Sequence, residues 1–284
     1  MTSGRPQNAG GWEERILPGV SPSQTLSEHL ARYEVASRFG PGRILDAACG
    51  VGYGTALLHE AGARQVIGVD ISIEACRHGL KAYGASVVCG DATTLPFASE
   101  IFDLVVSFET VEHVSDPAQL LSELNRVCKT NGMLITSVPN KRVYPPGNPF
   151  HLHEFGRGDI LCLIERNGFT ANTIMGQAFR PYPAVLARRA VVRCVPGLRR
   201  IAKLWRAFRR RRARLIGSQP GGDTPRWDGR PQSPHRGVVP EQIKAIRGSS
   251  WLRAPTYFIV IATKRKRVSN EAERSRATAK PGVA

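Results

Sequence analysis

The chain has 284 residues, 42% of them hydrophobic, which is enough for one α/β domain with a sizeable core and extensions. It contains no run of 18 or more apolar residues, and residues 1–19 lack the apolar region of a secretory signal. We therefore expect neither a transmembrane helix nor a signal peptide. The six cysteines form no CxxC pair, which argues against a zinc site or a disulfide framework and favours the reducing cytoplasm.

The formal net charge of +17 is distributed unevenly along the chain. Residues 1–180 hold 15 Lys+Arg against 18 Asp+Glu, whereas residues 181–284 hold 25 against 5. The basic charge therefore belongs to the C-terminal third. Such asymmetry points to a polyanionic partner or surface for that third and carries no information about the fold.

Apolar periodicity predicts alternating helices and strands after a mobile N-terminus at 1–24. Apolar residues at helical spacing predict an amphipathic helix over 25–39, ahead of the core. The strands that follow are predicted at 43–49, 65–72, 86–92, 102–109, 132–139 and 170–177. The later helices are predicted at 54–62, 73–84, 116–130 and 157–167.

This alternation predicts a doubly wound, Rossmann-like α/β fold with a seven-stranded sheet. The last apolar alternation, at 256–263, follows a gap of about 75 residues and is interpreted as a final antiparallel strand. We expect the following organisation: a core over 25–180, a basic helical insertion and linker over 181–250, the final strand over 251–264, and a disordered basic tail over 265–284.

A glycine turn follows the first predicted strand directly. Gly50 and Gly52 permit tight backbone geometry and close approach of a ligand. The turn is not the dinucleotide fingerprint, because Thr55 stands where that motif requires its third glycine. Asp46, just before the turn, suits a ligand with an ammonium or sulfonium group.

Two more carboxylates end the next two predicted strands. Asp70 follows Gly50 by 20 residues, a position from which a carboxylate accepts hydrogen bonds from ribose hydroxyls. Asp91 can accept a hydrogen bond from an adenine amino group while the Ala92 backbone contacts a ring nitrogen. Because successive parallel strands end at the same edge of a sheet, Asp46, Asp70 and Asp91 together predict a nucleoside site.

The segments LDAACGVGYG, VIGVDIS, GDATTLPF and FDLVVSFETVEHV resemble, as a set, the motifs of class I S-adenosylmethionine-dependent methyltransferases. The ubiquinone- and menaquinone-type enzymes are the most similar group, and the resemblance covers 25–180 and 256–263. It implies S-adenosylmethionine as methyl donor. It implies that the donor is held by Asp46, Gly50 and Gly52 at the methionine end, by Asp70, Ile71, Asp91 and Ala92 at the nucleoside, and by Phe108 and Glu109 on the methyl side.

Histidines in two loops are candidates for the catalytic base. Methyl transfer from a sulfonium is an in-line displacement that needs alignment, and an oxygen nucleophile gains from a nearby base. His113 lies in ETVEHV, and His151 and His153 lie in NPFHLHEF. The alternatives are a loop that closes the cofactor pocket and a packed lid. No metal site is predicted, because the His151–His153 pair has no third ligand nearby except Glu154.

The NPFHLHEF segment and the preceding SVPN resemble bacterial methyltransferases that modify sugars, glycolipids and cell-surface polysaccharides. An Asn-Pro-Pro-Tyr type motif, expected for methylation of base amino groups, is absent. We therefore predict O-methylation of a sugar, glycolipid or lipid-like hydroxyl. The alternatives are an RNA or protein methyltransferase, a quinone-type small-molecule methyltransferase, and a cofactor-binding partner without transferase activity.

The basic segment 198–216 predicts an interfacial helix. Its apolar residues at helical spacing include Trp205 and Phe208, and arginines and a lysine occupy the other face, a pattern typical of binding to an anionic membrane surface. A helix that covers the protein's own core would show the same stripe, and nucleic-acid contact is the less favoured alternative. Residues 217–237 are rich in Gly and Pro and predict a flexible linker. We expect a cytoplasmic protein that is peripheral on the inner membrane face.

Overall fold

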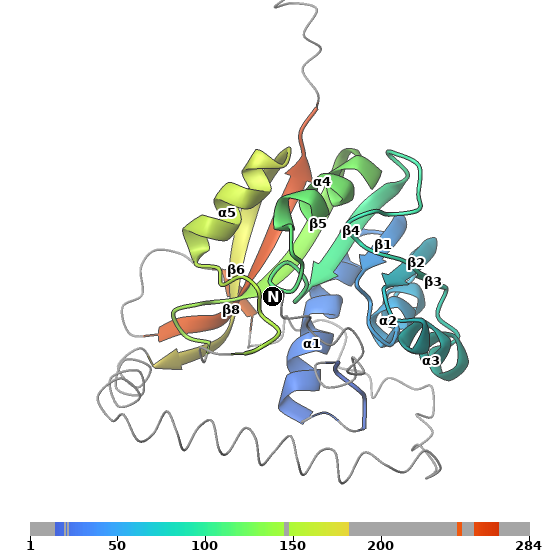
Figure 1. Cartoon of the computed structure of the whole chain (residues 1–284), viewed down its shortest axis with the longest axis horizontal. Coiled ribbons are helices and arrows are strands. Elements are labelled where there is room, and N and C mark those ends of the chain that lie inside the picture. The colour runs from blue at the N-terminus through green and yellow to red at the C-terminus, as the bar shows by residue number, and fades with distance from the viewer. Residues whose placement is uncertain are drawn as a thin grey trace, which may run out of the picture.

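The computed structural model describes residues 15–19, 21, 23–144, 148–181, 243–245 and 253–266. These residues form one mixed β-sheet with helices on both faces (Figure 1). The strands are β1 (Arg43–Ala47), β2 (Gln65–Asp70), β3 (Val87–Cys89), β4 (Phe102–Phe108), β5 (Cys128–Pro139), β6 (Phe169–Pro181), β7 (Ile243–Ala245) and β8 (Arg253–Lys264). The helices are α1 (Ser23–Ala36), α2 (Tyr53–Glu60), α3 (Ile73–Tyr83), α4 (Pro117–Val127) and α5 (Arg157–Arg166), with a 3-10 turn η1 (Ser37–Phe39).

The strand order is β3-β2-β1-β4-β5-β8-β6-β7. Strands β1 to β5 pair in parallel, and β8 lies antiparallel between β5 and β6. The predicted Rossmann-like fold, with seven strands and the last one antiparallel, is confirmed. Strand β7 is an addition, because it pairs with the outer edge of β6 from inside the range predicted to hold the insertion and linker. Three residues are too few to show a periodic pattern.

The sheet separates two apolar layers. Leu45 and Val105 face a cluster that includes Leu121 of α4 and Ile160 of α5. The alternate residues of the same strands, such as Ile44, face a second cluster on the opposite side of the sheet, formed with α1, α2 and α3. Both faces of the sheet are therefore covered by helices (Figure 1). This explains why the strand sequences are nearly continuous apolar runs.

Helix α4 ends earlier than predicted. The Asp116 side chain caps its start by accepting from the backbone N–H of Ala118 and Gln119 at 3.0 Å. The prediction ran to residue 130, but Cys128 is extended and pairs with Phe102 of β4, so β5 begins there. Pairing with the sheet therefore takes priority over helical continuation at this boundary.

Several predicted segments lie outside the described residues. These are the basic helix at 198–216, the linker at 217–237 and the tail beyond residue 266. Part of the N-terminal segment predicted to be mobile is described, and Ile16 and Leu17 pack against the apolar cluster around α1 and α2. Within the described part of the chain, no helix has the length and apolar character needed to cross a membrane.

Candidate active site

A cavity of about 730 Å³ opens at the carboxyl ends of β1 to β4. The strand order reverses between β1 and β4, and ligands of open α/β sheets bind in the crevice at such a point. The volume is that of an ordinary small-molecule site. Of the residues predicted to bind the cofactor, the cavity is lined by Gly50, Asp70, Ile71, Asp91, Ala92, Phe108 and Glu109.

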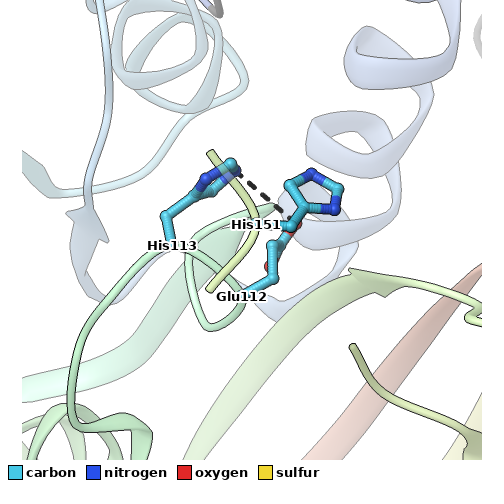
Figure 2. Close-up of side chains that lie close together, drawn as sticks. All are labelled: Glu112, His113 and His151. Carbon is cyan, nitrogen blue, oxygen red and sulfur yellow. Dashed lines mark ion pairs between the residues drawn. The ribbon is translucent and has the colours of Figure 1, made fainter. Parts of the chain in front are cut away.

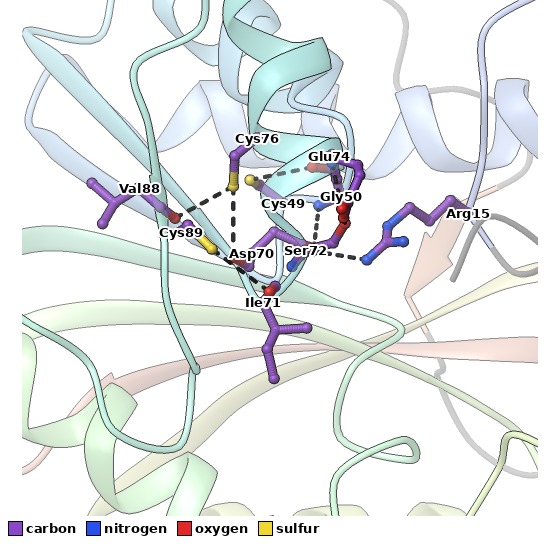
Figure 3. Close-up of polar contacts among 11 residues, drawn as sticks. Arg15, Cys49, Gly50, Asp70, Ile71, Ser72, Glu74, Cys76, Val88 and Cys89 are labelled. Atoms are coloured by element: carbon purple, nitrogen blue, oxygen red, sulfur yellow. Dashed lines mark hydrogen bonds and ion pairs between the residues drawn. The ribbon is translucent and has the colours of Figure 1, made fainter. Parts of the chain in front are cut away.

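The Asp70 carboxylate is held at the glycine turn by backbone donors. The Gly50 N–H donates to Oδ2 and the Ser72 N–H to Oδ1, both at 2.9 Å (Figure 3). Gly50 has φ +58°, a conformation that favours glycine. Sequence reasoning missed Arg15, whose guanidinium donates to Asp70 Oδ1 at 2.9 Å. Arg15 lies in the polar N-terminal segment, which has no periodic pattern that would place it at the sheet edge.

The part of the cavity next to β2 and β3 combines one apolar surface with one carboxylate. Ile71 directly follows β2, lines the cavity and is 71% exposed, so its apolar surface is open to a ligand. Asp91 Oδ1 accepts from the backbone N–H and the hydroxyl of Thr93, both at 2.8 Å. These contacts orient the Asp91 carboxylate at the edge of the cavity, beside the buried Ala92.

Asp46 and Gly52 do not line the cavity, although the sequence placed them there. Asp46 is 1% exposed and lies beneath the turn, where Thr55 Oγ1 donates to it at 2.8 Å and the Tyr33 hydroxyl at 3.2 Å. Burial raises the pKa of Asp46 to about 7. At Gly52 a Cβ would lie 3.2 Å from the Gly79 Cα, so this glycine permits α2 and α3 to approach closely.

Replacing Asp46 by asparagine should change how stability depends on pH. The folded-state pKa of about 7 lies above the ordinary value of 3.8, so the Asp46 contribution is present below about pH 4 and is lost as pH rises to 7. Relative to Asp46→Asn, the wild-type free energy of unfolding should fall by about 4 kcal/mol over this window. Urea unfolding from pH 4 to 7.5, without added ligand, measures the difference.

Asp103 provides the matched control. Partial burial acts to raise the pKa of the Asp103 carboxyl, but the Lys129 ammonium and the Arg43 backbone N–H together outweigh it and lower that pKa below its ordinary value. The Asp103 contribution is therefore constant above about pH 4 and is lost only below it, so Asp103→Asn should leave the slope between pH 5 and 7.5 unchanged. Parallel wild-type and Asp46→Asn curves would contradict a raised pKa at Asp46.

Helix α1 supplies a buried cation to the cavity. Arg32 is 1% exposed, and its Nη1 lies 3.3 Å from Glu109 Oε1. Its Nε donates to Gln177 Oε1 at 2.7 Å, and its guanidinium lies 4.4 Å from the ring centroid of Tyr257. Ser137 Oγ also donates to Glu109 at 2.9 Å. Burial raises the pKa of Glu109, and the charge of Arg32 opposes that rise.

Sequence reasoning missed this cation because it predicted α1 as a one-sided amphipathic helix. Arg32 lies next to the expected apolar stripe, where a charged residue normally faces solvent. Its partners Gln177 and Tyr257 come from β6 and β8, which are far away in the chain. Tyr33 of the same helix reaches Asp46 and packs edge-to-face on Phe108, with ring centroids 5.0 Å apart. No local pattern in α1 indicates these contacts.

The two histidine loops form one cluster at the cavity wall (Figure 2). The backbone N–H groups of Leu152 and His153 donate to the Glu112 carbonyl at 2.8 and 3.1 Å, which ties the NPFHLHEF loop to the loop after β4. The rings of His113 and His151 lie 4.9 Å apart at 78°. The sequence had treated these two histidines as alternatives.

His151 and His153 have different environments. Burial is the main cause, and the nearby His113 the second, of a pKa of His151 lowered to about 4. The His151 ring is therefore neutral at pH 7 and is a weak base. His153 does not line the cavity, because its Nε2 lies 3.3 Å from the Ser115 carbonyl oxygen and its ring lies beside Phe155.

A Rossmann-like sheet whose glycine turn and strand-end carboxylates surround one cavity is the arrangement of an α/β protein that binds a nucleoside cofactor. Residues 45–136 match a family model described as a methyltransferase domain. The chain belongs to the class I S-adenosylmethionine-dependent methyltransferase family, which confirms the assignment from its motifs. S-adenosylmethionine is the methyl donor of this family.

Three comparisons describe the similarity. A probable S-adenosylmethionine-dependent methyltransferase of Mycolicibacterium smegmatis is 33% identical over 57% of this chain and 66% of the relative. A demethylmenaquinone methyltransferase of Mycolicibacterium paratuberculosis is 34% identical over 37% of this chain and 46% of the relative. A Thermotoga maritima methyltransferase structure has a TM-score of 0.52 at 17% identity, with 85% of this chain and 92% of that chain covered. The chain thus spans just under two thirds of the first relative's length and about half of the second's.

Proposed function

We propose that this protein transfers the methyl group of S-adenosylmethionine to a hydroxyl of a sugar, glycolipid or lipid-like acceptor. The observation that carries the proposal is one cavity lined both by the glycine turn after β1 and by residues of the two histidine loops. The glycine turn, Asp70 and Ile71 form a nucleoside end. His113, His151 and the aromatic ring of Tyr257 form the other end, where an acceptor can lie beside the sulfonium.

In the proposed reaction the acceptor oxygen attacks the methyl carbon in line with the sulfur. An O–C bond forms, the S–C bond breaks with its electron pair remaining on sulfur, and the hydroxyl proton leaves. Alignment supplies most of the acceleration, so Asp70 and the glycine turn contribute by fixing the donor. Glu109, held by Arg32 and Ser137, and His113 are two groups in the cavity wall that can accept the proton. His153 supports the loop and does not meet the acceptor.

Two further features bear on the acceptor. The similarity to a demethylmenaquinone methyltransferase supports a quinone-type small molecule as the second candidate acceptor. Such a molecule is also lipid-like, and its reduced quinol form carries ring hydroxyls. The basic segment 198–216 lies outside the described residues, and its sequence supports an acceptor presented at an anionic membrane surface. Under this proposal the acceptor is a small molecule or glycolipid, and nucleic acid is the less favoured partner.

Incubating the full chain with methyl-labelled S-adenosylmethionine and separated lipid, glycan, RNA and protein fractions should label the lipid or glycan fraction. The label should resist mild alkali, because a methyl ether is stable where a methyl ester is cleaved. Label in RNA or protein would contradict the proposal. Tight donor binding without label in any fraction would instead support a cofactor-binding partner without transferase activity.

A further inference from the structure

The side chains of Glu112, His113 and His151 lie close together (Figure 2). His113 and His151 line the cavity, and Glu112 is buried beside them. Each offers one ligand atom, and these three atoms lie within 4.8 Å of one another. We propose that the three side chains bind a divalent transition-metal ion, with a remaining coordination position open to the acceptor hydroxyl. Sequence reasoning predicted no metal site, because it paired His151 with His153 and found no third ligand nearby except Glu154.

The distances suit a metal after small side-chain movements. Zinc-type ions bind His nitrogen and carboxylate oxygen at about 2.0–2.2 Å, so tetrahedral ligand atoms lie about 3.4 Å apart. His113 Nε2 lies 3.9 Å from Glu112 Oε1. The ligand atoms lie at most 4.8 Å apart, so they must approach one another by no more than about 1.4 Å to reach this spacing.

The backbone holds the two loops together without a metal. Glu112 and His113 are neighbours on the turn after β4, where the His113 N–H donates to the Thr110 carbonyl at 2.9 Å. His151 comes from the loop whose Leu152 and His153 N–H groups donate to the Glu112 carbonyl. The ligand set therefore lies on two mutually bonded loops.

A hydrogen bond of His113 also orients its ring for coordination. The Nδ1 of His113 lies 3.1 Å from the Phe150 carbonyl oxygen. A carbonyl oxygen accepts only, so Nδ1 carries the hydrogen and donates. In the neutral ring Nε2 then carries the lone pair, on the side where Glu112 lies. Metal-binding histidines characteristically donate their other ring N–H to a carbonyl or carboxylate in this way.

The chemistry of the three ligand groups limits which metal ions the site can bind. Two imidazoles and one carboxylate suit zinc, iron(II), manganese(II) or cobalt(II), and three protein ligands leave a position for substrate or water. Magnesium and calcium prefer sets of oxygen ligands. A small molecule in the cavity can reach the proposed site, because His113 and His151 line the cavity.

The role of the metal ion in catalysis rests on the proposed function. An acceptor hydroxyl bound to a divalent cation loses its proton more readily, as metal-bound water does. With His113 coordinated to the metal, the proton would pass to Glu109 or to solvent, and the oxygen would then attack the methyl carbon as the S–C bond breaks.

Metal binding can be measured on untagged full-length protein with neither donor nor acceptor present. After chelator treatment and dialysis, Zn²⁺ titration by calorimetry and Co²⁺ titration by visible absorption should each show one equivalent bound per chain. Glu112→Gln and His151→Asn should each weaken binding by about 100-fold. His153→Asn should retain wild-type affinity, because His153 lies on the same loop but outside the ligand set.

The outcomes separate this proposal from the proposed function. Equal Zn²⁺ and Co²⁺ affinity in wild type, Glu112→Gln and His151→Asn would overturn the site, as would no binding to the wild type. Circular dichroism checks that each variant is folded. If Glu112→Gln fails to fold, His151→Asn in the NPFHLHEF loop still tests the site. Metal binding without methylated product would contradict the O-methyltransferase assignment alone, and methylated product without metal binding would contradict this site alone.

Discussion

Replacing Asp70 by asparagine should lower the affinity for S-adenosylmethionine by about 100-fold, close to 3 kcal/mol. The Asp70 carboxylate lines the cavity and is oriented by the N–H groups of Gly50 and Ser72. Both of its oxygens can accept from ribose hydroxyls, whereas an asparagine has one accepting oxygen and an NH₂ group that cannot accept. Calorimetric titration with S-adenosylmethionine measures the loss, and Asp70→Ala should lose at least as much.

The control for Asp70 is the same substitution at the opposite end of the sheet. Asp103→Asn, at the start of β4, removes a carboxylate that pairs with Lys129 and should leave the donor affinity unchanged. Thermal unfolding without ligand checks that Asp70→Asn folds, since the backbone donors of the turn also bind this carboxylate. Unchanged affinity in a folded Asp70→Asn variant would refute the assignment of Asp70 to the ribose.

Replacing Arg32 by methionine should lower the free energy of unfolding by about 3–5 kcal/mol at pH 8. The change leaves Glu109 buried without its counter-charge and leaves Gln177 without its donor. The loss should shrink as pH falls toward 5, because a protonated Glu109 requires no counter-charge. Urea unfolding at both pH values measures the effect.

A second variant separates the charge from the packing contribution. Arg32→Met with Glu109→Gln removes both charges and should recover most of the lost stability. Arg38→Met is the matched control, because Arg38 is exposed and pairs with Glu34 on the surface, where an ion pair contributes at most about 1 kcal/mol. If Arg32→Met cost no more than Arg38→Met, the buried pair between Arg32 and Glu109 would not stabilise the fold.

The sequence alone determined the features that repeat locally. The alternation of strands and helices, the glycine turn and the carboxylates at the ends of β2 and β3 predicted the fold and the cofactor family, and both are confirmed. Such predictions succeed because helix and strand periods, and the geometry of a turn, depend on residues close together in the chain. The short strand β7 and the early end of α4 were missed, since pairing with a distant strand decides them.

Tertiary structure decided which distant residues share one cavity. It placed Arg15 on Asp70, Arg32 between Glu109 and Tyr257, and Asp46 beneath the turn. It also joined the loops of His113 and His151, which had appeared to be alternatives. The physical reason is common to all four findings. Contacts between elements far apart in the chain depend on how helices and loops pack at the edge of the sheet, and no short pattern encodes that packing.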